Sequence, residues 1–303
     1  MSWIQLKALI SPTQAEAMEE SLMAAGACSV TYEDAKDQPV LEPLLGTTPL
    51  WDTTIITGLF TADEDMEQVH VIANNVFQHL TQEDLPKYRV EILENQDWTR
   101  TWMEHFKPMQ FGSRLWICPS WQEAPDPKAV NLLLDPGLAF GTGTHPTTAL
   151  CLKWLDSQGE HLANKTVIDY GCGSGILGIA ALLLGASSVI GVDNDPQALL
   201  ASNDNLLRNK LESSLLDTYL PNDLPSDLSK IQADILLANI LAQPLYELRD
   251  RLAELTKIGG HIILSGILEE QAEDLRSYYE VHFEMDKVVI EDGWARLTGT
   301  KKD

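Results

Sequence analysis

The sequence VIDYGCGSG at residues 167–175 joins an apolar run to three glycines at alternate positions. An apolar stretch with helical spacing begins at residue 176, so the order predicts a strand, a tight turn and a helix. Glycine has no Cβ, and its backbone can take positive φ and approach a ligand closely. In an open parallel sheet, such a turn lies beyond the carboxyl end of a strand, where ligands bind. We therefore expect an α/β fold with a ligand site at Gly171 and Gly173.

The spacing of the glycines distinguishes between two classes of ligand. Dinucleotide-binding turns read G-x-G-x-x-G, whereas this chain reads G-x-G-x-G from Gly171 and carries Asp169 two positions ahead. This spacing is typical of a loop that binds S-adenosylmethionine rather than a pyrophosphate. A nicotinamide dehydrogenase is the alternative enzyme, and a turn without a ligand is the alternative structural role.

Two later strand ends carry polar residues that could face the same crevice. Residues 189–193, VIGVD, place Asp193 where nucleotide folds carry an acid that accepts hydrogen bonds from ribose hydroxyls. Residues 234–241, DILLANIL, place Asn239 at the end of a further strand. Asp193 could instead start the next helix. Polar residues at successive strand ends favour a shared site.

Apolar strands alternate with helices from about residue 111 onward, which predicts a mostly parallel sheet covered on both faces. Expected strands are 165–170, 188–193, 233–238 and 261–265, with helices at 176–184, 196–209 and 244–255 and a terminal hairpin at 281–290 and 294–300. Asp195 is the expected cap of the second helix. The segment 215–231 is longer than a connecting loop requires, and no function is predicted for it.

The first ninety or so residues form a separate pattern. Strands are expected at 3–10, 29–32, 53–60 and 88–93, and helices from Pro12 to Gly26 and over 66–80. This split order is that of a ferredoxin-like α+β sandwich. Trp98, Trp102 and Phe106 recur every fourth residue and predict a linker helix. The expected domains are 1–94, a linker helix at 95–108, and 109–303.

Composition limits the partners. The formal net charge is −24 and no basic stripe is present, which disfavours nucleic acid and suits a basic protein or a cationic small molecule. The charge could also serve solubility alone. No apolar run is long enough for a membrane span, and the N-terminus does not resemble a secretory signal. Four scattered cysteines suit reduced thiols in the cytoplasm, and no residue cluster predicts a metal.

Residues 134–148, LDPGLAFGTGTHPTT, look like a phosphate-binding loop, but no lysine follows the glycines. Together with DYGCGSG (169–175), GVDNDPQ (191–197) and LLANIL (236–241), this stretch resembles the ribosomal protein L11 methyltransferase family (PrmA) along the whole chain. The GxGxG turn is common among methyltransferases, whereas AFGTGTHPTT is far more specific. S-adenosylmethionine has no phosphate, which explains the missing lysine.

The resemblance implies a class I, S-adenosylmethionine-dependent enzyme with a Rossmann-like, mostly parallel seven-stranded sheet. It implies trimethylation of lysine side-chain and N-terminal amines of a large-subunit ribosomal protein, captured by the N-terminal domain. Thr148, Gly171, Asp193 and Asn239 would contact the cofactor, with Asp169 and Gly173 beside them. Asn239 would orient the acceptor amine or the cofactor, and Phe140 and Gly141 would close over the methyl group. We expect a monomer.

Other interpretations stay open at this point. An RNA methyltransferase or another protein N-methyltransferase could share the fold, and so could a non-catalytic assembly factor. His145 could act in catalysis, but a loop histidine bonded to backbone is the favoured interpretation. The amines modified, their order and any general base are not determined by the sequence.

Overall fold

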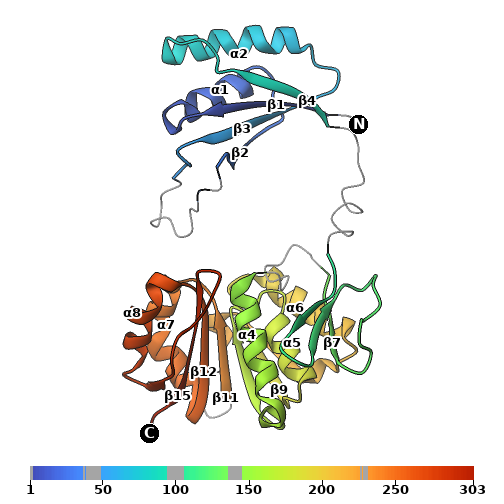
Figure 1. Ribbon diagram of the computed structural model, residues 1–303, viewed down its shortest axis with the longest axis vertical. Helices are drawn as coiled ribbons and strands as arrows, with labels where there is room; N and C mark the ends of the chain where they lie inside the picture. The colour runs from blue at the N-terminus through green and yellow to red at the C-terminus, as the bar shows by residue number, and fades with distance from the viewer. Residues whose placement is uncertain are drawn as a thin grey trace. The chain divides into compact units, whose positions relative to one another are not determined.

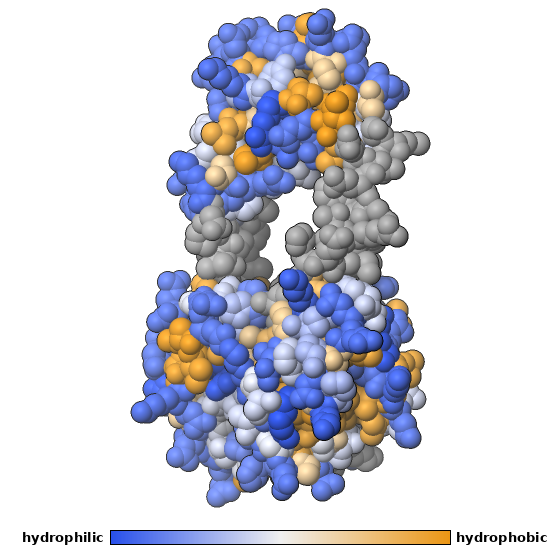
Figure 2. Space-filling model, turned by 45° about the vertical axis from the view of Figure 1, so that its right-hand side comes forward, coloured by the Kyte–Doolittle hydropathy of each residue, from blue (hydrophilic) through white to orange (hydrophobic). Residues whose placement is uncertain are grey.

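The computed structural model describes residues 3–36, 38, 49–93, 106–135, 145–225, 227 and 231–303. The chain forms two compact units, Met1–His105 and Phe106–Asp303 (Figure 1). Most of the predicted linker helix at 95–108, and the predicted site residues Phe140 and Gly141, lie outside the described residues. Among the residues that are described, no helix combines the length and apolar character needed to cross a membrane. Hydrophilic side chains predominate on the face shown in Figure 2.

The first unit confirms the predicted ferredoxin-like order. Its strands are β1 (Trp3–Ile10), β2 (Ser29–Asp34), β3 (Thr54–Thr61) and β4 (Tyr88–Leu93), and its helices are η1 (Pro12–Gln14), α1 (Ala15–Ala24) and α2 (Met66–Thr81). The antiparallel sheet has the order β2-β3-β1-β4, and both α-helices cover one face of it (Figure 1). Alternate residues of β1, such as Leu6 and Ala8, are buried beneath them.

Local sequence signals explain where α2 begins and which of its faces is buried. The carboxylate of Asp65 accepts a hydrogen bond from the Glu67 amide at 3.0 Å, which satisfies a donor at the helix start. Val69, Ala73 and Phe77 recur every fourth residue and are almost fully buried against the sheet. The pattern that predicted the helix is therefore the pattern that buries it.

The second unit contains a large mixed sheet in the order β10-β9-β8-β11-β12-β15-β13, with β14 paired to β15 beside this path. Its strands are β8 (Thr166–Tyr170), β9 (Ser188–Val192), β10 (Leu216–Tyr219), β11 (Ala233–Asn239), β12 (Thr256–Leu268), β13 (Phe283–Met285), β14 (Val289–Glu291) and β15 (Trp294–Lys301). The first five strands along this path are parallel and β15 runs antiparallel to β12. This confirms the predicted Rossmann-like α/β class, with β14 as an additional strand.

Helices cover both faces of this sheet (Figure 1). They are α4 (Pro146–Ser157), α5 (Ile176–Leu183), α6 (Pro196–Arg208), α7 (Ala242–Leu255) and α8 (Glu269–Tyr279). Successive residues of β11 enter two different cores: Leu237 packs in the core that includes α4 and α5, and Leu236 in the core that includes α7 and α8. Burial on both faces explains why the strand reads as a continuous apolar run.

A separate small sheet is formed by β5 (Met109–Phe111), β6 (Leu115–Cys118) and β7 (Val130–Leu133). Asp156 near the end of α4 accepts hydrogen bonds from the amides of Ser113 at 2.6 Å and Arg114 at 3.2 Å, in the turn between β5 and β6. An added Cβ on Gly112 would lie 2.3 Å from this carboxylate, so the close approach requires glycine there. The small sheet is thus attached to the helix that carries Thr148.

Several elements differ from the sequence-based prediction. The segment 215–231 contains β10, which pairs with β9 as an edge strand. The predicted terminal hairpin forms between β14 and β15, but the stretch 281–290 contains a further short strand, β13, that also pairs with β15. Helix α8 was not predicted because its few apolar residues are interspersed with five charged ones in EEQAEDLRSYY. Short or strongly charged elements give weak periodic signals, and tertiary packing decides them.

The sheet order determines where a ligand can bind. From β8 the chain moves to β9 and β10 on one side, and it then returns to β11 and β12 on the other. The order therefore reverses between β8 and β11. The carboxyl ends of these two strands flank the crevice in which open α/β sheets bind ligands.

Candidate active site

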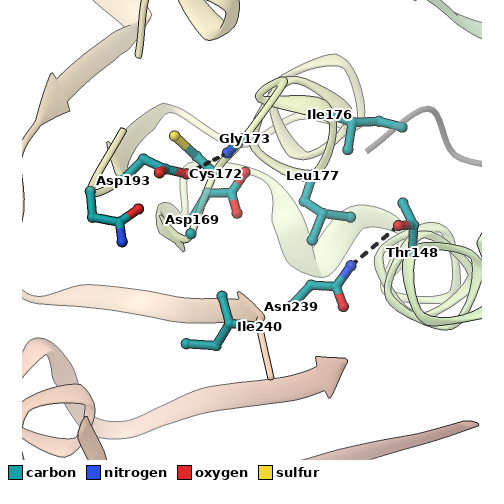
Figure 3. Close-up of a pocket in the computed structure, with 11 residues that line it drawn as sticks. Thr148, Asp169, Cys172, Gly173, Ile176, Leu177, Asp193, Asn239 and Ile240 are labelled. Atoms are coloured by element: carbon teal, nitrogen blue, oxygen red, sulfur yellow. Dashed lines mark hydrogen bonds between the residues drawn. The ribbon is translucent and has the colours of Figure 1, made fainter. Parts of the chain in front are cut away.

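A pocket lies at this reversal point, where Figure 3 shows its lining side chains converging. It is lined by Thr148, Asp169, Gly171, Cys172, Gly173, Ile176, Leu177, Asp193, Asn194, Asn239 and Ile240. Six of the eight residues predicted for the site are in this set. The other two, Phe140 and Gly141, lie outside the described residues. Residues of β8, β11 and α4 and the residues that follow β9, which are far apart in the sequence, thus meet at one place.

The glycine turn after β8 has the backbone geometry that its sequence predicted. The φ angles of Gly171, Gly173 and Gly175 are +78°, +54° and +77°, a region that residues with a Cβ rarely adopt. The turn is fixed to the neighbouring strand because the amides of Gly171 and Cys172 donate to the Val192 carbonyl at 2.7 and 3.1 Å. A Cβ added to Gly171 would lie 2.3 Å from Cγ2 of Ile240. Glycine is therefore required both by the dihedral and by the space.

Asp193 joins the glycine turn to the start of α6. Its Oδ2 accepts the Gly173 amide at 2.8 Å (Figure 3), and its Oδ1 accepts the Asp195 amide at 3.0 Å. Asp195 is the residue that caps α6, accepting the Gln197 amide at 2.9 Å, so the predicted cap is confirmed. Each carboxylate oxygen has two acceptor positions. Asp193 can therefore hold the turn and still accept hydrogen bonds from a ligand in the pocket.

Asp169 is only 2% exposed, below the glycine turn. Burial raises its pKa to about 7, in part offset by the hydrogen bond that it accepts from the Gly178 amide at 2.9 Å, while the nearby Asp193 carboxylate adds to the rise. Gly178 lies in the first turns of α5, and a Cβ there would lie 2.8 Å from Val189. Asp169 thus connects the end of β8 to the helix that follows.

On the opposite side of the pocket, Thr148 and Asn239 form a pair (Figure 3). The amide nitrogen of Asn239 donates to the Thr148 hydroxyl at 3.2 Å. Thr148 is 1% exposed in the first turn of α4, and Asn239 is the last residue of β11. The bond fixes the orientation of the Asn239 amide, whose oxygen remains available as an acceptor beside the pocket.

His145 has a structural role at the start of α4. Its Nδ1 accepts the Thr147 amide at 3.4 Å as the helix N-cap, and the ring packs edge-on against Trp294 with centroids 4.6 Å apart. Partial burial lowers the pKa of His145, which favours the neutral ring. Because Nδ1 is the acceptor, the neutral ring carries its proton on Nε2. The favoured interpretation from the sequence, a histidine bonded to backbone, is confirmed.

Sequence reasoning missed the side chains that hold the glycine turn from behind. Ser202 on α6 donates to the Gly173 carbonyl, and Asn205 on the same helix donates to the Ser174 carbonyl, each at 2.9 Å. Both side chains are buried. One sequence signal could have revealed Ser202 and Asn205: they are polar residues three positions apart, and so lie on the same face of the helix.

The lining also limits the ligand. Within the described part of the chain, none of the eleven residues that line the pocket is Lys or Arg. A phosphate group would therefore find no cationic side chain to pair with among these lining residues. In all of the residues that the structure describes, no group of three or more His, Cys, Asp or Glu side chains is placed to hold a metal ion. The pocket combines the carboxyl groups of Asp169 and Asp193, apolar side chains and a hydrogen-bonded Thr–Asn pair.

Comparison with known proteins agrees with this geometry. The family model described as "Ribosomal protein L11 methyltransferase (PrmA)" matches residues 2–302. A ribosomal protein L11 methyltransferase of Marinobacter nauticus is 57% identical over 303 residues, covering all of both chains. One of Pseudomonas aeruginosa is 55% identical over 302 residues, covering 100% of this chain and 99% of its own.

Among solved structures, the ribosomal protein L11 methylase of Lactobacillus delbrueckii subsp. bulgaricus is 30% identical, with a TM-score of 0.56. The match covers 65% of this chain and all of that one. Since the family model and both relatives extend along the whole chain, the protein is a methyltransferase that belongs to the ribosomal protein L11 methyltransferase family.

Proposed function

We propose that the protein transfers methyl groups from S-adenosylmethionine to lysine side-chain and N-terminal amines of ribosomal protein L11, giving trimethylated amines. The observation that carries the proposal is the pocket in which the glycine turn and Asp193 face the Thr148–Asn239 pair. The names of the relatives support L11 as the substrate.

The residues of the pocket fit S-adenosylmethionine. Asp193 would accept hydrogen bonds from the ribose hydroxyls, and Gly171 would allow the backbone to approach the ligand. Apolar contacts would come from Ile176, Leu177 and Ile240. When bound, the cofactor supplies an electrophilic methyl on a positively charged sulfur, and Asp193 is an anion that complements this charge.

The chain's own task is to present a neutral amine in line with the methyl group. A free lysine has a pKa of about 10.4, so its neutral form costs roughly 4–5 kcal/mol at pH 7. A partly desolvated site beside a positive charge lowers that pKa. Asn239 would orient the amine or the cofactor through its amide oxygen, since Thr148 fixes the amide nitrogen. Holding the reactants in alignment is the main source of acceleration in such a displacement.

We assign capture of the protein substrate to residues 1–94. This segment belongs to a compact unit of its own, whereas every residue that lines the pocket belongs to the second unit. The net charge of −24 suits a basic ribosomal protein as substrate and disfavours direct binding of RNA. We expect the protein to act as a monomer in the cytoplasm.

The test is incubation of the purified enzyme with methyl-labelled S-adenosylmethionine and purified, unmethylated L11. Mass spectrometry of the product should show increases in steps of one CH₂, up to three at each modified amine. The variant Asp193→Ala, which lacks the proposed ribose acceptor, is the control. Label in ribosomal RNA instead of L11, or no mass increase with the wild type, would overturn the proposal.

A further inference from the structure

Helix α6 and the residue that follows it carry three polar side chains, Ser202, Asn205 and Asn209, spaced by three and four residues. The first two donate to consecutive carbonyls of the glycine turn, those of Gly173 and Ser174. Ser202 is 0% and Asn205 is 7% exposed, so these bonds are largely shielded from water. A trans peptide directs its N–H opposite to its C=O. Fixing these carbonyls therefore sets the direction in which the N–H groups of the turn point.

Asn209, the residue after α6, forms a second set of bonds with the end of β7. Its side-chain nitrogen donates to the Leu133 carbonyl at 2.9 Å, and its side-chain oxygen accepts the Leu133 amide at 2.7 Å. The same nitrogen also donates to the Asn205 carbonyl at 2.8 Å. The amide of Asn209 thus pairs with Leu133 as a neighbouring strand would.

Arg208 connects the two sets. Its Nη1 donates to Oδ1 of Asn205, whose Nδ2 donates to the glycine turn. Its Nε lies 3.6 Å from the carboxylate of Asp135, which also accepts the Ser120 amide at 2.7 Å. Both ends of the Asn205 amide are therefore occupied, and its orientation is determined. A continuous chain of hydrogen bonds and one ion pair runs from the glycine turn to residues 133–135.

We propose that Asn205 is a positioning residue for cofactor binding, and that α6 couples the cofactor pocket to the end of β7 through Asn205 and Asn209. The inference rests on the proposed function, because it takes the pocket as the S-adenosylmethionine site. Asn205 is not among the residues that line the pocket. It acts through the Ser174 carbonyl, whose position sets the turn that lines the pocket.

The first test compares two leucine variants on the same helix. Asn205→Leu leaves the buried Ser174 carbonyl without its donor. Asn203→Leu is the matched control, because Asn203 donates to the Leu199 carbonyl at 2.8 Å and to the Thr218 hydroxyl at 3.0 Å, away from the turn. Titration calorimetry with S-adenosylhomocysteine should show roughly tenfold weaker binding for Asn205→Leu, which corresponds to about 1.4 kcal/mol. Asn203→Leu should bind like the wild type.

Kinetics separate positioning from a general loss of structure. For Asn205→Leu we expect KM for S-adenosylmethionine to rise while kcat at saturating cofactor changes by less than about twofold, the result of lost binding alone. If this variant does not fold, Ser202→Ala tests the neighbouring bond to Gly173 with a smaller change. If Asn205→Leu, or Ser202→Ala in its place, folds and binds S-adenosylhomocysteine as tightly as the wild type does, the positioning role is refuted. A wild type that does not bind S-adenosylhomocysteine would instead refute the proposed function.

Hydrogen exchange tests the coupling. The Leu133 amide, bonded to Asn209, should exchange at least about threefold more slowly when S-adenosylhomocysteine is bound to the wild type. In Asn205→Leu at saturating ligand, the bonds between Asn209 and Leu133 are retained, but this slowing should be lost. Slowing that persists in Asn205→Leu, or that is absent from the wild type while the ligand binds, would show that α6 does not couple the two sites.

Discussion

Replacing Gly171 with alanine tests whether the glycine turn is required by its dihedral, by space, or by both. The φ of Gly171 is +78°, and an added Cβ would lie 2.3 Å from Cγ2 of Ile240. A Cβ at positive φ costs roughly 1–2 kcal/mol. Carbon atoms in contact normally stay about 3.5–4.0 Å apart, so the second contact forces a shift. Overpacking of this kind typically costs about 1–3 kcal/mol.

Two matched variants separate these contributions. Gly293 has nearly the same φ, +77°, but an added Cβ there meets no atom within 4 Å. Gly293→Ala should therefore lower the free energy of unfolding by only the dihedral cost, roughly 1–2 kcal/mol. Gly171→Ala should lower it by roughly 2–5 kcal/mol, the sum of both costs. In an Ile240→Ala background, Gly171→Ala should approach the smaller value, because the clashing methyl is gone.

Urea unfolding of Gly171→Ala, Gly293→Ala, Ile240→Ala and the Gly171→Ala/Ile240→Ala double variant measures these differences in the free energy of unfolding. Calorimetry with S-adenosylhomocysteine measures the effect on ligand binding. We expect Gly171→Ala to weaken binding by more than about tenfold, since Ile240 follows Asn239 and a displaced Ile240 would move both walls of the pocket. Equal destabilisation by Gly171→Ala and Gly293→Ala would refute the steric argument. The steric argument would also be refuted if Gly171→Ala lowered the free energy of unfolding by the same amount in the Ile240→Ala background as in the wild type.

Three further predictions concern individual side chains of the pocket. Asp193→Asn keeps an acceptor for the Gly173 amide but loses the charge and the acceptor for the Asp195 amide, and calorimetry should show roughly tenfold weaker S-adenosylhomocysteine binding. Thr148→Val removes the hydroxyl that fixes the Asn239 amide, and steady-state kinetics should show a lower kcat, by roughly tenfold, with a smaller change in cofactor KM. The pKa of Asp169 is about 7, above its unfolded value, so its folded form binds the extra proton and the wild type should lose stability as pH rises from about 4 to 7. Urea unfolding as a function of pH should show that Asp169→Asn lacks this component.

The sequence predicted most of the large elements because their periodic patterns are strong. β8 and β11 are apolar on both faces, and the glycine turn needs residues that tolerate positive φ, so both leave clear signals. Strand β10 left none: LDTY is a four-residue edge strand, and only its pairing with β9 makes it a strand. Helix α8 was hidden for a related reason, because its three buried residues are spread among charged ones.

The candidate site divides in the same way. Asp169, Asp193 and Asn239 could be predicted because each stands at the end of an apolar strand, a position that the topology turns into a shared crevice. The spacing of Ser202 and Asn205 could have marked them as a polar pair on one helix face, but their contacts with the glycine turn depend on how that helix packs across the sheet. The bond between Asn239 and Thr148 joins residues 91 positions apart and follows only from the tertiary structure.

The charges of the site match the charge balance of the proposed reaction. Each methyl transfer converts the sulfonium into a neutral thioether and the neutral acceptor amine into an ammonium cation, which must lose a proton before it can accept another methyl group. A positive charge is thus present near the pocket before and after transfer, but it moves from one side to the other. Asp193 lies beside the glycine turn, whereas the Thr148–Asn239 pair on the opposite side is neutral. In the proposed arrangement the ribose lies at Asp193 and the acceptor amine lies near the Thr148–Asn239 pair, so the charged aspartate is on the cofactor side and the neutral pair would favour release of the cationic amine after each transfer.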